Sequence, residues 1–262
     1  MEKRLALIGF GEAGSTFAGA AGWGEGVAVW DLLAERRRAA SAAEALAEAP
    51  LVLSLVTADQ ALPAARDYAS LLAPGAIWCD CNSVAPGTKR AAAEAVEAAG
   101  GLYVDVAVLA PVNPARLAVP LLLAGSAAGR AEVLLRGVGF CNTRVVGAEV
   151  GRASAIKMIR SVMVKGIEAL TAEMMLAAEA AGVADEVLAS LDASEKALPW
   201  RARAAYNIER MVTHGARRAA EMAESAKTLA ELGVEPMMTE GTVRRQAEMA
   251  GRKDRLMKGD AA

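Results

Sequence analysis

The sequence predicts an α/β domain followed by an all-α domain, and two observations lead to this fold class. In the first half, short runs rich in Val, Leu and Ile alternate with Ala-rich stretches, which is the pattern of a parallel sheet with crossover helices. From Gly147 onward no strand pattern is found, and Ala, Met, Leu, Glu and Arg recur at helical spacing. We therefore expect one domain over residues 1–147 and a helical domain over residues 148–262.

Each predicted strand of the first domain is a short apolar run bounded by turn residues or helical stretches. The predicted strands cover residues 3–9, 27–31, 51–56, 76–80, 102–107, 119–124 and 143–146.

A long helix is predicted where the two domains meet. Residues 149–181 contain no proline, and Gly182 is a natural stop signal. As one helix this stretch would span roughly 45 Å. Its many apolar side chains exceed what the rest of the helical domain can cover, so we expect a homodimer formed through this domain.

Composition and charge narrow the class of partner. The chain has 29 Lys and Arg against 31 Asp and Glu, so no broad positive surface for nucleic acid or an anionic membrane is expected. No uncharged stretch approaches the roughly 20 residues that span a bilayer. Three cysteines are too few for a disulfide framework, and no stretch resembles a secretory leader. A small-molecule ligand and a cytoplasmic location are therefore expected.

A glycine-rich motif, Gly9-Phe-Gly-Glu-Ala-Gly14, directly follows the first predicted strand and opens a helical stretch. In this context Gly9 allows a tight turn, Gly11 allows a pyrophosphate to approach the backbone, and Gly14 allows the helix to pack closely on the strand. Exposed amides at the helix start can then bind phosphate. The motif predicts a Rossmann domain for a nicotinamide dinucleotide.

Asp31 ends the second predicted strand, where a carboxylate can accept hydrogen bonds from ribose hydroxyls and so favours NAD. The following run of Arg36, Arg37 and Arg38 keeps NADP as the alternative, because an arginine can pair with a 2′-phosphate. The other residues of the predicted cofactor site up to the third strand complete the set Gly9, Phe10, Gly11, Glu12, Ala13, Gly14, Asp31, Leu55 and Val56.

Three motifs together resemble the β-hydroxyacid dehydrogenase and 6-phosphogluconate dehydrogenase superfamily. They are the glycine-rich motif, Asp80-Cys-Asn-Ser-Val-Ala-Pro86 and Gly151-Arg-Ala-Ser-Ala-Ile-Lys157. The chain is most similar to a bacterial branch with a carboxy-terminal domain of uncharacterised function. The resemblance implies that Lys157 is the catalytic acid/base, that Ser83 lies near the nicotinamide and that the helical domains interlock in a dimer.

The chain also departs from this family at the substrate loop. Where the family has a serine and paired glycines for a substrate carboxylate, residues 105–111 read Asp-Val-Ala-Val-Leu-Ala-Pro. The family's asparagine four residues after the lysine is Ser161, and its later Lys-Asp pair is Ala220-Glu221. The substrate is therefore expected to differ from the family's usual ones.

The predicted long helix singles out Lys157 without reference to any family. Ser154, Lys157, Ser161, Lys165 and Glu168 form one polar stripe at three- or four-residue spacing on an otherwise apolar helix. The stripe is either a solvated face or part of a site. A lysine whose pKa falls from about 10.4 toward 7 to 8 can remove a hydroxyl proton as hydride leaves.

Candidate substrate-binding residues lie on two helical stretches. Ser161 follows Lys157 by one turn, where it can hold a substrate oxygen or simply allow a close helix contact. A later stripe contains His214, Arg217 and Arg218, and an arginine there can clamp a carboxylate. Arg217 with Glu221 is equally a surface ion pair.

These features predict an NAD(P)-dependent oxidoreductase that transfers hydride between the nicotinamide and a small hydroxy acid or the matching carbonyl. An imine (C=N) reductase is the alternative within enzymes, although Lys157 argues against it. A noncatalytic dinucleotide-binding sensor is the alternative from another class.

Overall fold

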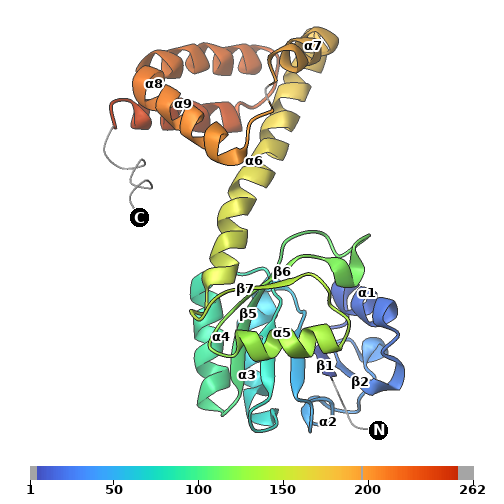
Figure 1. Ribbon diagram of the computed structural model, residues 1–262. Helices are drawn as coiled ribbons and strands as arrows, with labels where there is room; N and C mark the ends of the chain where they lie inside the picture. The colour runs from blue at the N-terminus through green and yellow to red at the C-terminus, as the bar shows by residue number, and fades with distance from the viewer. Residues whose placement is uncertain (1–4, 196, 253–262) are drawn as a thin grey trace. The chain divides into compact units, whose positions relative to one another are not determined.

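The computed structural model describes residues 5–195 and 197–252, and the chain divides into two compact units, 1–162 and 163–262 (Figure 1). The first unit contains the sheet and its helices. The described residues of the second unit form helices and their connections, without a strand. The boundary between the two units lies inside the long helix. It is 15 residues beyond the domain boundary at residue 147 that the sequence predicts.

The first unit is built on one seven-stranded sheet in the order β2-β1-β3-β4-β5-β6-β7. The strands are β1 (Leu5–Ile8), β2 (Val27–Trp30), β3 (Leu51–Ser54), β4 (Ile77–Asp80), β5 (Leu102–Val108), β6 (Leu121–Ala124) and β7 (Thr143–Gly147). All seven predicted strands are confirmed within a few residues at their ends. No strand lies between Asp31 and Leu51, a stretch that the structure describes in full.

The expectation of a purely parallel sheet is wrong at one position. β6 pairs antiparallel with β5, whereas every other neighbouring pair is parallel. The physical reason lies in the connection, because residues 109–120 form a loop with one 3-10 turn and no crossover helix. Without a crossover the chain can only return in the opposite direction.

Helices cover both faces of the sheet, which explains why the strands are almost continuously apolar. The helices α1 (Glu12–Ala21) and α5 (Ala128–Gly137) pack against strand residues such as Leu7 and Leu53. The helices α2 (Ala42–Leu46), α3 (Ala61–Tyr68) and α4 (Pro86–Ala98) pack against the alternate residues, such as Ile8 and Trp78. The sheet is thus the middle of three layers.

The strand order places a ligand crevice at a defined point. The chain leaves β1 for β2 on one side and then crosses to β3 on the other. At such a switch point the loops at the carboxyl ends of β1 and β3 diverge and leave a crevice. The glycine-rich loop follows β1 there, so the fold puts the predicted cofactor motif at this crevice.

The long helix α6 (Arg152–Ala181) begins in the first unit and continues into the second, whose described part also contains α7 (Ala184–Ser194), α8 (Trp200–Glu231) and α9 (Met237–Met249). α6 is the predicted long helix and begins three residues later than expected, because Gly151 adopts a positive φ of 100°. α8 and α9 pack closely at Gly215, where an added Cβ would collide with the Gln246 carbonyl oxygen. None of the described helices is long and apolar enough to cross a membrane.

α6 carries an exposed apolar surface. Large apolar side chains that remain exposed on this helix include Ile159, Val162, Met163, Ile167, Leu170 and Leu176. A contiguous apolar surface of this kind is typical of a protein interface. The homodimer expected from the sequence stays a prediction that this surface supports.

The buried Glu173 of α6 holds the start of α9. Its carboxylate accepts hydrogen bonds from the Met238 and Thr239 backbone amides at 2.7 and 2.8 Å and from the Thr239 hydroxyl at 2.6 Å. Burial alone would raise the pKa of Glu173, but these three bonds outweigh it and leave the pKa lowered. A lowered pKa means that folding favours the charged carboxylate.

Glu173→Gln should therefore destabilise the helical unit by about 1.5–3 kcal/mol at neutral pH, the usual cost of losing hydrogen bonds to a charged group. The difference should shrink as the pH falls below about 4.3 and through the lowered pKa, because the wild-type carboxylate is protonated there. Thermal melts across pH 3–7 check this. The exposed Glu168→Gln is the matched control, and an equal loss in both variants would contradict the capping role.

Candidate active site

The glycine-rich loop is shaped by close backbone contacts. Gly9 has a φ of 95°, and an added Cβ there would lie 2.5 Å from the Leu55 carbonyl oxygen. An added Cβ on Gly14 would lie 2.6 Å from the Gly9 carbonyl oxygen. Over Gly11 the space is open, since only the Arg36 guanidinium comes within 3.9 Å of an added Cβ. Two glycines therefore close the turn, while Gly11 leaves room for a ligand.

Asp31 fastens the loop to the end of β2. Its carboxylate accepts hydrogen bonds from the Phe10 amide at 2.7 Å and from the Leu33 amide at 2.9 Å. Each carboxylate oxygen retains a further lone pair. Asp31 can thus hold the loop and still accept a ribose hydroxyl.

The three arginines after β2 have different surroundings. Arg37 stacks on the Trp30 ring at 4.2 Å and donates to the carbonyl oxygens of Asp31 and Leu32. Arg38 stacks on the Phe10 ring at 4.8 Å. Arg36 alone of the three lines the cleft that contains Gly11 and Asp31. It is the arginine placed to meet a phosphate in that cleft.

Two adjoining cavities lie at the carboxyl ends of the strands. The first, about 450 Å³, is lined by Gly9, Gly11, Glu12, Trp30, Asp31, Arg36, Leu55, Val56 and Tyr68, among others. The second, about 410 Å³, is lined by Glu12, Ala13, Leu55, Val56, Cys81, Asn82, Ser83, Pro111 and Lys157, among others. Because Glu12, Leu55 and Val56 line both, the cavities meet along these residues.

Lys157 and Ser83 meet at the second cavity. The Lys157 ammonium donates a hydrogen bond of 2.5 Å to the Ser83 hydroxyl. Ser83 lies on the loop after β4, and Lys157 lies in the second turn of α6, 74 residues later. The two residues predicted separately from two motifs are thus direct neighbours.

Asn82 is a part of this site that sequence reasoning missed. Its side-chain oxygen accepts a hydrogen bond from the Val56 amide at 2.7 Å, and its amide donates to the Ser54 hydroxyl at 3.0 Å. Asn82 therefore joins the loop after β3 to the loop after β4, and both loops line the second cavity. Asn82 directly precedes Ser83 in the motif Asp80–Pro86, and this neighbourhood was the sequence feature that could have identified it.

A buried ionic cluster beneath these loops was also missed. Lys89 is fully buried and lies 2.9 Å from an Asp80 oxygen and 3.5 Å from an Asp105 oxygen. Tyr103 donates to the other Asp80 oxygen at 2.6 Å. Burial, followed by the Asp80 charge, raises the pKa of Tyr103, which keeps its hydroxyl protonated as a donor. No periodicity in the sequence brings these four residues together.

Cys81 also lines the second cavity but is unsuited to acid/base work. Burial raises the pKa of the Cys81 thiol to about 12, and nearby Lys89 and Lys157 offset this only in part. The thiol is therefore neutral near pH 7. Of the ionisable side chains that line this cavity, Glu12 and Lys157 remain as candidates for charge or proton transfer.

The predicted substrate-binding residues are divided between the units. Ser161 is half-buried on α6 one turn beyond Lys157, within the first unit. His214, Arg217 and Arg218 lie on α8 in the second unit, where His214 is exposed. Arg217 forms an ion pair with Glu221, which is the surface pairing considered from the sequence. The role of all four stays a prediction.

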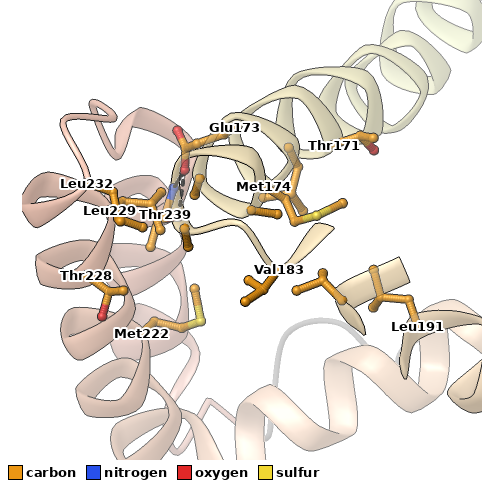
Figure 2. Close-up of a pocket in the computed structure, with 15 residues that line it drawn as sticks. Thr171, Glu173, Met174, Val183, Leu191, Met222, Thr228, Leu229, Leu232 and Thr239 are labelled. Atoms are coloured by element: carbon orange, nitrogen blue, oxygen red, sulfur yellow. Dashed lines mark hydrogen bonds between the residues drawn. The ribbon is translucent and has the colours of Figure 1, made fainter. Parts of the chain in front are cut away.

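The helical unit has a cavity of its own, about 530 Å³, which Figure 2 shows. Its walls are mainly apolar and include Met174, Val183, Leu191, Met222 and Leu229. Glu173 points its carboxylate at the start of α9, as described above, rather than offering it to a ligand. None of the predicted site residues lines this cavity.

Comparison with protein families gives two matches. Residues 4–147, more than half of the chain, match the family described as the NAD binding domain of 6-phosphogluconate dehydrogenase. Residues 178–249 match a domain of unknown function, DUF1932. Both parts of the resemblance drawn from the sequence are confirmed, including the uncharacterised carboxy-terminal domain.

Relatives with known structures cover nearly the whole chain. A conserved hypothetical protein from Sinorhizobium meliloti 1021 is 35% identical over 97% of this chain and 91% of that one, with a TM-score of 0.59. A second conserved protein, of unknown function and described as structurally similar to 3-hydroxyacid dehydrogenases, is 30% identical over 94% of this chain and 96% of that one, with a TM-score of 0.61.

Two other matches are more limited, the first in the length that it covers and the second in sequence identity. An uncharacterised 28.5 kDa protein from Methanothermus fervidus is 30% identical over 146 residues, which is 55% of this chain and 54% of that protein. The match thus spans about half the length of this curated relative. An imine reductase variant from Myxococcus stipitatus, in complex with NAD⁺, is 20% identical over 95% of this chain and 94% of that one. Its TM-score of 0.74 shows a shared fold.

The residues of the cleft fit a dinucleotide. The amino terminus of α1 has no side-chain cap, and the space over Gly11 next to it is open. Unsatisfied amides at a helix start, with the positive end of the helix dipole, form an anion site. Gly11 and the first turn of α1 would hold the pyrophosphate, and Asp31 would hold the adenosine ribose.

Gly11→Val is expected to raise the dissociation constant for NAD⁺ at least about tenfold, because a branched side chain would fill the space that the phosphates need. The fold should persist, since the added atoms meet only the flexible end of Arg36. Gly19→Val is the matched control, because Gly19 lies on the same helix with nothing near its Cβ. Titration calorimetry checks both, and equal affinities would remove Gly11 from the site.

Asp31 and Arg36 should act in opposite directions on cofactor choice. Asp31→Asn should weaken NAD⁺ more than NADP⁺ by about tenfold, while Arg36→Ala should weaken NADP⁺ more than NAD⁺, since a charged hydrogen bond contributes about 1.5–3 kcal/mol. Arg38→Ala, outside the cleft, should leave the ratio of the NAD⁺ and NADP⁺ dissociation constants unchanged. Dissociation constants for both cofactors give the answer, and a wild type that prefers NADP⁺ tenfold would assign the choice to Arg36.

Proposed function

The chain belongs to the family of the NAD binding domain of 6-phosphogluconate dehydrogenase, and we propose that it is an NAD(P)-dependent oxidoreductase acting on a small hydroxy acid or the matching carbonyl. One observation carries the proposal: the Lys157 ammonium contacts Ser83 at a cavity that adjoins the dinucleotide cleft. This contact supports a role for Lys157 in proton transfer beside the expected cofactor site.

The proposed chemistry divides hydride and proton transfer between two partners. A bound nicotinamide dinucleotide would supply the hydride acceptor or donor. In the oxidising direction neutral Lys157 takes the substrate's hydroxyl proton at Nζ, and in the reducing direction the ammonium returns it to the carbonyl oxygen. Ser83 accepts a hydrogen bond from Nζ, which orients the amine and leaves the serine proton for the substrate oxygen.

The walls of the second cavity set the size and polarity of the substrate. Val56, Val108, Pro111 and Val112 make one side of this cavity apolar. The family's serine and paired glycines are absent from this loop, so the carboxylate must be held elsewhere. Ser161, one turn beyond Lys157 in the same unit, is the residue proposed for that contact.

Glu12 favours imine reduction as a second candidate. Its carboxylate lines the cavity that contains Lys157, and no hydrogen bond to it is found among the described residues. A carboxylate stabilises a cationic iminium better than an anionic acid. Steady oxidation of NADH or NADPH with a ketone and an amine, but not with a ketone alone, and no reduction of NAD⁺ or NADP⁺ by a hydroxy acid, would decide for this candidate. No turnover with any of them would favour the noncatalytic sensor.

Lys157→Ala is expected to lower turnover by roughly 10²–10⁴, the usual contribution of a general acid or base, while cofactor affinity stays nearly unchanged. Lys157→Arg should fail almost as badly, because a guanidinium does not release its proton near neutral pH. The limb of the pH profile that needs a deprotonated group for alcohol oxidation should disappear in the alanine variant.

Lys165→Ala on the same helix is the matched control and should keep wild-type turnover. Stopped assays and cofactor titrations across pH 6–10 make these measurements. If Lys157→Ala retained more than about a third of the wild-type rate on a true substrate, Lys157 would be part of a solvated stripe instead.

A further inference from the structure

The buried cluster around Lys89 lies directly beneath the two residues of the proposed site. Asp80 and Asp105 are register partners on the neighbouring parallel strands β4 and β5, so their side chains lie next to each other on one face. Both are buried. Two adjacent carboxylates in the interior repel each other unless a cation lies between them, and Lys89 from α4 fills that place.

The Asp80 side of the cluster holds the loop that carries Ser83. An Asp80 carboxylate oxygen accepts a hydrogen bond from the Asn82 backbone amide at 2.9 Å. Lys89 also donates to the Asp80 backbone carbonyl at 2.6 Å. The chain immediately after β4 is therefore fixed up to the residue that precedes Ser83.

The Asp105 side of the cluster holds the beginning of the helix that carries Lys157. The second Asp105 oxygen accepts hydrogen bonds from the Gly151 amide at 3.1 Å and the Ser154 amide at 2.9 Å. These amides belong to the positive end of α6, which a carboxylate stabilises. Lys157 follows Ser154 by one helical turn, so a shift of this first turn carries Lys157 with it.

We infer that Lys89 is a positioning residue for the proposed reaction: by bridging Asp80 and Asp105 it sets the distance between Ser83 and Lys157. The inference rests on the proposed acid/base role of Lys157. Lys89 is not among the residues that line either cavity, although its ammonium lies near the Cys81 thiol. It acts through the two aspartates, one bound to the Ser83 loop and one bound to α6.

The charges of the cluster also explain why the bridge is specific. One ammonium compensates one carboxylate, and the partial positive charge at the start of α6 faces the other. A hydrophobic residue at position 89 would remove the cation and leave both carboxylates buried. A residue that only filled space could not hold the loop and the helix at one fixed separation.

The experiment uses variants that remove the Lys89 contact with Asp105. They keep either the net charge of the cluster or the hydrogen bonds from position 105 to the start of α6. Lys89→Met with Asp105→Asn removes one positive and one negative charge, and the asparagine oxygen can still accept from the start of α6. Asp105→Asn alone is the milder second variant and serves if the double variant does not fold. Tyr103→Phe is the matched control, because it removes a hydrogen bond to Asp80 in the same cluster and leaves the bridge intact.

Competitive acetylation with acetic anhydride across pH, followed by peptide mass spectrometry, measures the reactivity of Lys157 without any substrate or cofactor. Both bridge variants should change the Lys157 labelling rate by about threefold or more, which corresponds to about half a pKa unit. Lys165 is the internal reference and should not change. Glu12 and Cys81, the other ionisable groups lining the Lys157 cavity, are the same in every variant.

Turnover gives the second readout. The bridge variants should lower kcat by about 10- to 100-fold, the effect of displacing a reacting group by about 1 Å, and leave the NAD⁺ dissociation constant unchanged. Tyr103→Phe should lower the melting temperature with kcat and Lys157 labelling close to wild type. A loss of kcat in Tyr103→Phe as large as in the bridge variants would make the cluster merely structural and overturn the inference.

Lys157→Ala, measured in parallel, separates this inference from the proposed function. If Lys157→Ala is inactive while folded bridge variants label and turn over like wild type, the positioning inference is wrong and the proposed function stands. If Lys157→Ala remains active, the proposed function is wrong. Changed Lys157 labelling in the bridge variants would then still establish that Lys89 positions this lysine.

Discussion

The ammonium of Lys89, buried between Asp80 and Asp105, is the interaction on which the arrangement of the first unit depends. Removing one partner of a buried ion pair costs about 3–5 kcal/mol, because the remaining charge is left without compensation. A buried pair adds little net stability over apolar packing, so its contribution here is a fixed geometry. It ties β4, β5, α4 and the start of α6 together at one point.

This cluster lies beneath Ser83 and Lys157, at the carboxyl edge of the sheet where the crevice is found. The crevice at the β1 and β3 switch point exists because the chain crosses from one side of β1 to the other. Gly11 keeps that crevice open, and Asn82 joins the loops after β3 and β4 beside it. A pre-organised site needs side chains held in fixed positions and open space for the ligand. The Lys89 cluster and Gly11 are suited to these two requirements.

The sequence by itself determined the elements and the identity of the principal groups. Alternating apolar runs and Ala-rich stretches specified all seven strands, because a strand buried on both faces has to be apolar throughout. The glycine spacing specified the loop after β1, because Gly9 and Gly14 are positions where a Cβ would collide with backbone. Lys157 was found by local pattern, since a polar residue in an apolar helix is conspicuous without knowledge of its partner, whereas Ser83 was indicated by the resemblance to a known family.

Only the tertiary structure decided which of these groups meet. The 2.5 Å contact of Lys157 with Ser83 joins residues 74 positions apart, and no local period encodes such a separation. No local pattern singles out Lys89, which is buried beside the register partners Asp80 and Asp105. The reversed direction of β6 likewise depends on a loop whose path is set by packing. Sequence patterns report the environment of one element, whereas pairing and charge compensation arise between elements.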